Sequence, residues 1–151
     1  MAADDGSISM RRHVAQSVAL ATELQVLLAD RVPPAYRIFD YGTGLYLVND
    51  AFGRAAFLSK DYKAAREYLL EQTELPTEGV VVMCCSGPNM WLAQALLRAG
   101  YRDDVLTFLE GVGKYWTKDS EGKLDVWIAD LKKGVVPDMR QNNRIDYGYL
   151  Y

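Results

Sequence analysis

The feature that most constrains the fold is a pattern that occurs twice in the chain. An amphipathic segment, a short break and a second amphipathic segment occupy residues 44–73 and recur at 88–116. Within each segment the apolar residues fall three and four positions apart, which is the spacing of one face of an α-helix. The copies are about forty residues apart, an interval typical of helical-hairpin repeats. The pattern therefore predicts an all-α protein whose hairpins pack side by side. The alternative is two unrelated hairpins with similar patterns.

Local signals predict where these helices begin and end. Asp61 can accept hydrogen bonds from the free amides of the helix that follows it. Pro88 suits a first helical turn, where its missing N–H is not needed. Gly100 suits a left-handed C-cap, and the adjacent Asp103 and Asp104 favour the positive end of the next helix. Each copy is thus expected to be a hairpin of two helices.

The 151 residues are expected to form a single domain, with the two hairpins flanked by further helices. Residues 1–8 are predicted to be a frayed lead, 9–31 an N-terminal helix and 123–134 a capping helix. The stretch before residue 44 contains Tyr41-Gly42 and is interpreted as a connector with a turn. The tail, 138–151, is polar and then aromatic, and is expected to be either disordered or docked by its tyrosines.

One short segment, VVVMCC at 80–85, has the β-branched composition of a strand. A single strand makes no sheet, and no second convincing strand is present. We interpret the segment as an extended, buried connector. Its two cysteines, Cys84 and Cys85, are the only ones in the chain, and adjacent cysteines seldom bridge to each other. They are expected to be core residues in a reducing compartment.

The first copy also carries a sequence of small and bulky residues typical of one family. The residues, in order, are Gly53, Ala56, Tyr62, Ala65 and Leu69, with Pro76 after them. Their order and spacing resemble the tetratricopeptide repeat, in which small residues of one helix receive bulky residues of the other. The second copy is looser, with Ala93, Arg102 and Val105 in place of the glycine, the aromatic residue and the alanine.

The stretch GPNM-x-LA-x-x-LL-x-x-G also looks like the C-terminal part of poorly characterised bacterial proteins of this repeat type. The resemblance covers about residues 44–134. It implies a right-handed array of antiparallel helical hairpins, with N- and C-terminal helices as caps.

The same resemblance implies a concave face, lined by the first helix of each hairpin, where such proteins usually bind extended peptides. This partner-binding groove would present Asp50, Arg54 and Phe57 from one unit and Met90, Gln94 and Arg98 from the next. Asp50 places a negative charge where the family's carboxylate clamp would have a cation, so a C-terminal carboxylate is not the expected ligand. The alternative is a solvated helix face that binds nothing.

Few other residues point to chemistry. The chain has no phosphate-binding loop, dinucleotide fingerprint or nucleophile elbow. His13 is the only histidine and is expected to lie on the surface, and one His with two adjacent Cys cannot form a zinc site without several carboxylates. No metal, cofactor or enzymatic activity is expected. The formal net charge of −3 argues against nucleic acid, and no apolar run is long enough to span a membrane. Trp91, Trp116 and Trp127 are expected to pack between helices, or to anchor a partner.

The expected function is therefore a non-enzymatic protein–protein interaction module that binds a partner segment on its groove. An alternative is a structural protein that forms a homo-oligomer through its C-terminal aromatic region, DYGYLY. A third possibility is a small thiol-dependent enzyme that uses Cys84 or Cys85. A cytoplasmic location is expected, unless a secretion signal has been removed.

Overall fold

The structure is a computed structural model that describes residues 5–29, 38–76, 87–117, 119 and 121–140. Within these ranges it contains α-helices, one short 3-10 helix and no strand, which confirms the predicted all-α class. The elements in chain order are α1 (Asp5–Ala29), α2 (Ile38–Leu58), α3 (Tyr62–Glu71), η2 (Gln72–Glu74), α5 (Trp91–Arg98), α6 (Arg102–Val112) and α7 (Lys123–Lys133).

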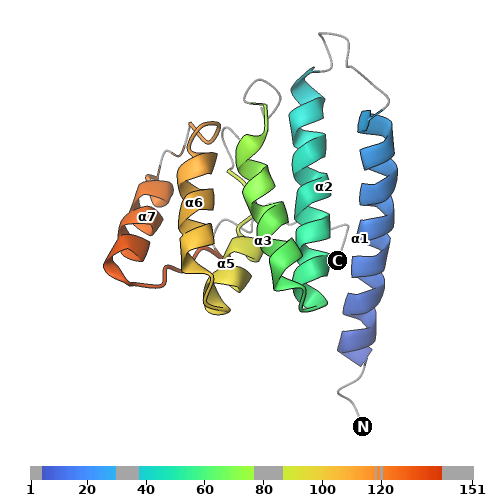
Figure 1. Cartoon of the computed structure of the whole chain (residues 1–151), viewed down its shortest axis with the longest axis horizontal. Coiled ribbons are helices and arrows are strands. Elements are labelled where there is room, and N and C mark those ends of the chain that lie inside the picture. Colours follow the sequence, from blue (N-terminus) through green and yellow to red (C-terminus); the bar gives the residue numbers. More distant parts are fainter. Residues whose placement is uncertain (1–4, 30–37, 77–86, 118, 120, 141–151) are drawn as a thin grey trace.

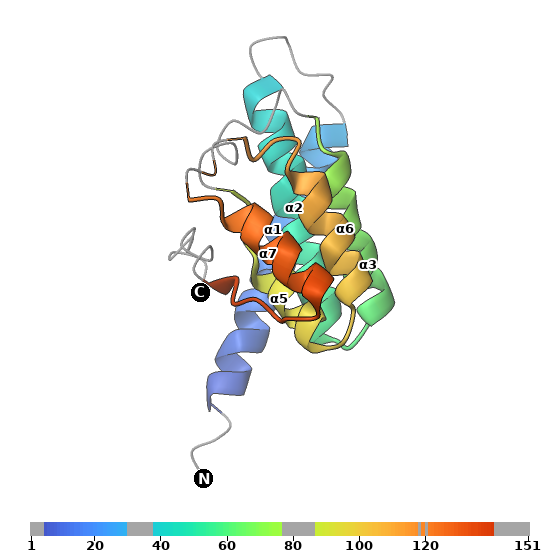
Figure 2. The same cartoon turned by 90° about the vertical axis from the view of Figure 1, so that its left-hand side faces the viewer.

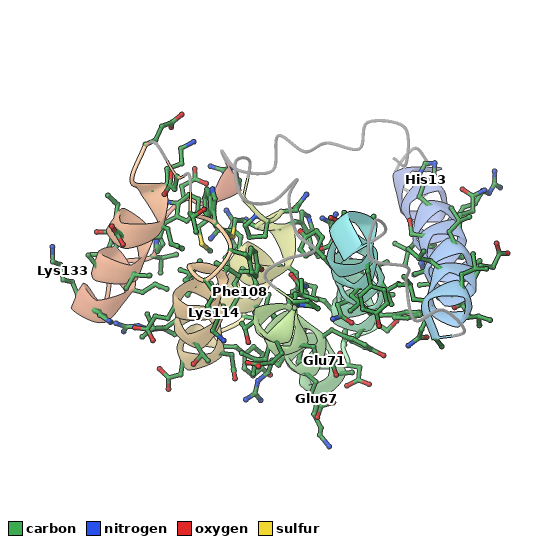
Figure 3. The ribbon with its side chains drawn as sticks, turned by 90° about the horizontal axis from the view of Figure 1, so that it is seen from above. His13, Glu67, Glu71, Phe108, Lys114 and Lys133 are labelled. Atoms are coloured by element: carbon green, nitrogen blue, oxygen red, sulfur yellow. The ribbon has the colours of Figure 1, made fainter. Side chains whose placement is uncertain are left out.

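The helices stand in a row and run alternately up and down, with α1 at one end and α7 at the other (Figure 1). Seen from above, α2 and α5 lie on one side of the row, and α3 and α6 lie on the other (Figure 3). Contacts join α2 to α3 and α5 to α6 within each pair. Further contacts join the pairs to each other: α2 to α5, α3 to α6 and α3 to α5. The two hairpin segments therefore pack side by side.

Several helix ends lie where the sequence signals predict them. The Asp61 carboxylate accepts a hydrogen bond from the Ala64 N–H at 3.1 Å, as expected of an N-cap. Gly100 and Gly134 follow α5 and α7 with φ of +97° and +89°, the left-handed conformation that glycine adopts without strain. The observed α7 falls within the predicted 123–134 range.

The start of α2 differs from the prediction. The helix begins at Ile38 and continues through Gly42 and Gly44, so the expected turn at Tyr41-Gly42 is wrong. The reason is packing against α1, since a Cβ on Gly44 would lie only 3.2 Å from Leu28 Cδ1. Gly44 therefore allows close approach of two helices and does not mark a turn.

The start of α5 also differs. The helix begins at Trp91, three residues after the proline expected in its first turn. Gly87 has a φ of +70°, and the Asn89 side chain accepts a hydrogen bond from the Trp91 N–H at 2.8 Å. In this local turn an asparagine oxygen binds a nearby main-chain amide, so the helix begins only after the turn, at Trp91.

The core lies between the two layers of helices. Its members with no measurable exposure include Ala65, Met90, Ala93, Leu96, Val105, Phe108, Leu109, Val112, Leu131 and Met139. Phe108 points from α6 into the interior, whereas Glu67 and Glu71 point outward from α3 (Figure 3). Trp116 and Trp127 are buried and pack together, with ring centroids 6.0 Å apart, which fits the expected packing role.

Two glycines let the pairs approach closely. A Cβ on Gly53 of α2 would lie 2.5 Å from Leu92 Cδ2 of α5, and a Cβ on Gly111 of α6 would lie 2.5 Å from Thr73 Cγ2 of η2. Real Cβ atoms do not make such short contacts, so both positions require glycine unless the neighbouring side chain shifts. The missing side chains create the space for the joint between the pairs.

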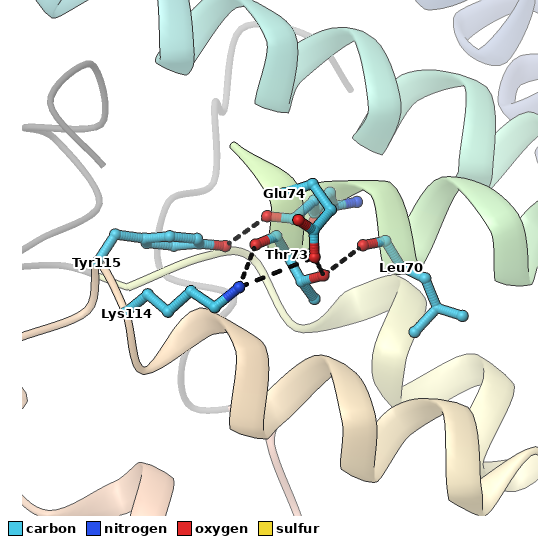
Figure 4. A network of polar contacts seen from close by, with 6 residues as sticks. Leu70, Thr73, Glu74, Lys114 and Tyr115 are labelled. Atoms are coloured by element: carbon cyan, nitrogen blue, oxygen red, sulfur yellow. Dashed lines mark hydrogen bonds and ion pairs between the residues drawn. The ribbon is translucent and has the colours of Figure 1, made fainter. Parts of the chain in front are cut away.

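Polar contacts reinforce this joint. The Arg66 guanidinium of α3 donates two hydrogen bonds to the Asp104 carboxylate of α6, at 2.7 and 3.3 Å. Near the other end of α6, Lys114 donates to the main-chain oxygen of Thr73, and Tyr115 donates to that of Gln72 (Figure 4). The carboxylate of Asp104 therefore binds across the joint, as well as lying in the first turn of α6.

The connector 80–85 with Cys84 and Cys85, residues 1–4 of the predicted lead and residues 141–151 of the predicted tail lie outside the described residues. The rest of the predicted lead, residues 5–8, is helical because α1 begins at Asp5, so the predicted helix start at residue 9 is wrong. None of the helices in the described ranges is both long and apolar enough to cross a membrane.

Candidate functional site

The residues expected from the first unit gather around one tryptophan. Asp50 and Arg54 of α2 form an ion pair of 2.9 Å, and each side chain is only 13% exposed. The Arg54 guanidinium carbon lies 5.4 Å from the Trp91 ring centroid, within the range of a cation–π contact. Phe57 meets Trp91 edge to face, with centroids 5.8 Å apart. The three predicted residues thus lie together at the contact between α2 and α5.

The Asp50–Arg54 ion pair has a structural role and is not accessible to a ligand. Burial raises the pKa of the Asp50 carboxyl, and the neighbouring Arg54 cation only partly opposes this effect. One oxygen of the Asp50 carboxylate, Oδ1, has no hydrogen-bond partner among the described residues. Because both charges are largely buried and face each other, they cannot also meet a ligand without rearrangement.

A buried tyrosine continues this face of α2 one turn earlier. The Tyr46 hydroxyl accepts a hydrogen bond from the Asn89 N–H at 2.7 Å, in the turn that precedes α5. Burial raises the pKa of Tyr46 well above its usual value, and the negative charge of Asp50 adds to the effect. The sequence interpretation missed Tyr46. Its signal is the spacing of four residues from Tyr46 to Asp50 and again to Arg54, which puts all three on one helix face.

A second buried polar group lies at η2. Gln72 is 1% exposed, and neither atom of its side-chain amide has a hydrogen-bond partner within the described ranges. Tyr115 approaches it but donates to the Gln72 main-chain oxygen, at 3.3 Å. Burial raises the pKa of Tyr115 above its usual range. A buried amide without hydrogen-bond partners lowers the free energy of unfolding by about 1–3 kcal/mol.

The residues expected from the second unit lie on successive turns of one face, from the residue before α5 to its end: Met90, Gln94 and Arg98. We call this set the α5 face. Met90 has no measurable exposure and belongs to the core, and Gln94 is 4% exposed. The prediction that both are open to a partner is therefore wrong. Arg98 is exposed, as predicted.

What covers Gln94 is the protein's own chain. The Met139 N–H donates a hydrogen bond to Gln94 Oε1 at 2.7 Å, and the Met139 side chain is fully buried. Residues 135–140 leave the end of α7 and run past α5 (Figure 2). We call this stretch the C-terminal segment. Any extended peptide has main-chain N–H groups that could donate to the side-chain amide oxygen of Gln94 in the same way.

The local sequence explains the course of the C-terminal segment. Gly134 turns the chain at the end of α7, and Pro137 cannot donate a helical hydrogen bond. From Val136 to Arg140 exposure alternates: Pro137 and Met139 are buried, while the residues between and beside them are exposed. Alternation of this kind is typical of an extended chain with one face on a surface.

Charges gather at the same place. Arg140 donates to the Asp138 carboxylate through its Nε and Nη2, at 2.8 and 2.6 Å. These bonds, with a main-chain bond from Arg140, lower the pKa of Asp138 to about 2, and the positive charge of Arg98 adds a smaller effect. Gln94 therefore binds the backbone of the C-terminal segment, whereas the charge of Arg98 only favours the ionised form of Asp138.

The remaining candidates are His13 and the two cysteines, and the cysteines lie outside the described residues. His13 lies on α1, at the opposite end of the row from α7 (Figure 3). No group of three His, Cys, Asp or Glu residues in the described part of the chain lies close enough together to hold a metal ion. Comparison with known proteins finds no family model, no curated protein and no solved structure that matches the chain significantly.

Proposed function

We propose that the protein is a non-enzymatic interaction module, built as a tetratricopeptide-like array, that binds an extended segment of a protein partner on the α5 face. The observation that carries this proposal is the bond from the Met139 N–H to the buried Gln94 Oε1. It supports the proposal because α5 offers an extended chain a side-chain acceptor for its main-chain N–H, beside an apolar surface, at the place where such arrays bind peptides.

The array itself is supported by the contacts of the small residues. Ala65 is fully buried, and Gly53 lies against Leu92 and Tyr68, which come from the neighbouring pair and from its own. The contacts of α2 with α5 and of α3 with α6 are those expected when one hairpin stacks on the next. The observed two-layer row is the arrangement that such stacking produces.

A photo-crosslinking experiment in cells tests the proposal. A photoreactive amino acid replaces Arg98, which is exposed beside Gln94. The matched control replaces Lys63 on α3, whose side chain is 85% exposed and lies on the other layer of the row. We expect position 98 to give intermolecular crosslinks that map to a short extended stretch of one or a few proteins. Crosslinks no more abundant than at position 63, or only to this chain's own residues, would contradict the proposed function.

A homo-oligomeric assembly is a second candidate, and exposed apolar side chains favour it. On α1, at one end of the row, Leu20, Val26 and Leu27 are each more than half exposed. Near the other end, Val126 and Val136 are 56% and 61% exposed. Apolar residues at the ends of a helical array can bury against a second copy. Sedimentation velocity at rising concentration tests this candidate: a dimer that is lost in Leu27→Glu supports it, and a monomer throughout contradicts it.

A further inference from the structure

We infer that the partner segment carries an acidic residue followed by a methionine-sized apolar residue, as in Asp138-Met139, and that it competes with the C-terminal segment for the α5 face. This inference rests on the proposed function and specifies its ligand. The C-terminal segment is then an internal stand-in for the partner, and the face is free only when residues 137–140 leave it.

The first step is that the segment binds as a peptide ligand would. Its described contacts with α5 use a side-chain acceptor, Gln94, and no helix-to-helix packing. It follows Gly134, whose left-handed conformation ends α7, so the chain can change direction there without unwinding the helix. The segment is thus joined to the fold by one turn and held by two buried side chains, Pro137 and Met139, of which Met139 has no measurable exposure.

The second step concerns the anchor. Met139 has no measurable exposure and packs in the same cluster as Met90 and Leu97. A buried methionine needs an apolar environment of its own size, and leucine or methionine in a partner would fill the same space. The adjacent N–H must remain available, because Gln94 Oε1 would otherwise lose its partner in the interior. Proline is therefore excluded at the anchor position of the partner.

The third step concerns charge. Asp138 precedes the anchor, and Arg98 lies one helical turn beyond Gln94, the residue that binds the N–H of the anchor. In the C-terminal segment, Arg140 already pairs with the Asp138 carboxylate at 2.6 Å, and the Arg98 cation acts on this carboxylate only through its charge. A partner with the acidic residue but without the following arginine would offer its carboxylate to Arg98 alone. We therefore expect such a partner to bind more tightly than a copy of the C-terminal segment.

The fourth step is the competition. A segment attached directly to α7 acts at a millimolar or higher effective concentration. If it occupies the face about 99% of the time, the apparent affinity for a partner falls about 100-fold. A variant that releases the segment should restore that affinity without any change in the α5 face itself.

The test uses the full chain and a fluorescent peptide with the sequence of residues 134–140, GVVPDMR, measured by fluorescence anisotropy. The released variant is Met139→Asp, because a carboxylate cannot take the buried position. We expect the released variant to bind the peptide at least tenfold more tightly than the native chain does. Binding should fall again when Gln94→Leu is added to the released variant, or when the peptide's methionine is replaced by serine. A peptide that lacks the final arginine should bind more tightly than GVVPDMR.

Equal weak binding to the native chain and to a folded Met139→Asp variant, with circular dichroism to confirm folding, would overturn the inference. If that variant does not fold, the native chain is titrated with the peptide at millimolar concentration while the Met139 amide is followed by NMR. Displacement of its native signal supports the inference, and no change contradicts it. Intermolecular crosslinks at position 98 together with no peptide binding would reject this ligand chemistry and leave the proposed function standing.

Discussion

A glycine in α6 gives the sharpest test of how the two helical pairs pack. In Gly111→Ala, the new Cβ would lie 2.5 Å from Thr73 Cγ2 and 2.6 Å from Thr73 Cβ. Thr73 cannot simply rotate away, because its hydroxyl donates to the Leu70 main-chain oxygen at 2.7 Å (Figure 4). Forcing an extra methyl group into such a contact costs about 1–3 kcal/mol.

The magnitude depends on a second, opposing effect. Alanine is about 1 kcal/mol more favourable than glycine inside a helix. Breaking the Thr73 hydrogen bond to relieve the contact would add about 1 kcal/mol to the cost. We therefore expect Gly111→Ala to lower the free energy of unfolding by about 1–3 kcal/mol.

The matched control is Gly113, which lies two residues after Gly111 in the chain. It is exposed, has a φ of −57°, and the nearest atoms to a new Cβ would be Glu110 O at 3.4 Å and Leu124 Cδ2 at 3.6 Å. Gly113→Ala should be neutral or stabilising by up to about 1 kcal/mol. Urea unfolding followed by circular dichroism measures both variants. If Gly111→Ala proves as stable as Gly113→Ala, the close contact between α6 and η2 is wrong.

Two further predictions concern the buried amide of Gln72 and the carboxyl groups of Asp50 and Asp138. Gln72→Met should raise the free energy of unfolding by about 1–2 kcal/mol, because it removes a buried amide without hydrogen-bond partners and keeps the side-chain volume. Gln25→Met, at an exposed position, is the control in the same urea assay. A loss of stability at position 72 would contradict this prediction, because it would mean that the Gln72 amide has a hydrogen-bond partner. Carboxyl NMR should show Asp50 titrating above its ordinary value of 3.8 and Asp138 at about 2. Since folded Asp50 binds its proton more tightly than the unfolded chain does, its contribution to stability is full below 3.8 and is lost as the pH rises through the raised pKa. The Asp138 contribution is present above 3.8 and is lost as the pH falls through about 2. Carboxyl titrations displaced in the opposite directions would contradict these environments.

Much of the fold can be predicted from local sequence signals. The periodicity of α3, α6 and α7 identifies helices whose buried residues, such as Ala65 and Leu109, are those the spacing selects. The caps at Asp61 and Gly134 act within a few residues and so are visible in the sequence. The structural role of a glycine is harder to predict from the sequence than a helix cap. Gly44 looks like part of a turn, yet it lies inside α2 because α1 comes close to it, a contact between distant residues.

The candidate site shows the same limit. The spacing of Met90, Gln94 and Arg98 correctly places them on one side of α5. It could not show that Gln94 is already bonded to Met139, which follows 45 residues later in the chain. Helix α2 differs from its prediction for a related reason. It contacts α1, α3 and α5, so residues such as Tyr46 are buried outside the single apolar face that the periodicity identified.

Native-state hydrogen exchange at the Met139 amide tests most directly whether the C-terminal segment can leave the α5 face. Its N–H lies in a buried bond of 2.7 Å to Gln94 Oε1, so it should be protected from exchange. We expect this protection to be at least about 100-fold weaker than that of the Leu109 amide in the core of α6, because the segment opens without global unfolding. Equal protection of the two amides, with the same dependence on denaturant, would mean that residues 137–140 leave only when the whole protein unfolds. That result would contradict a segment that exchanges with a partner.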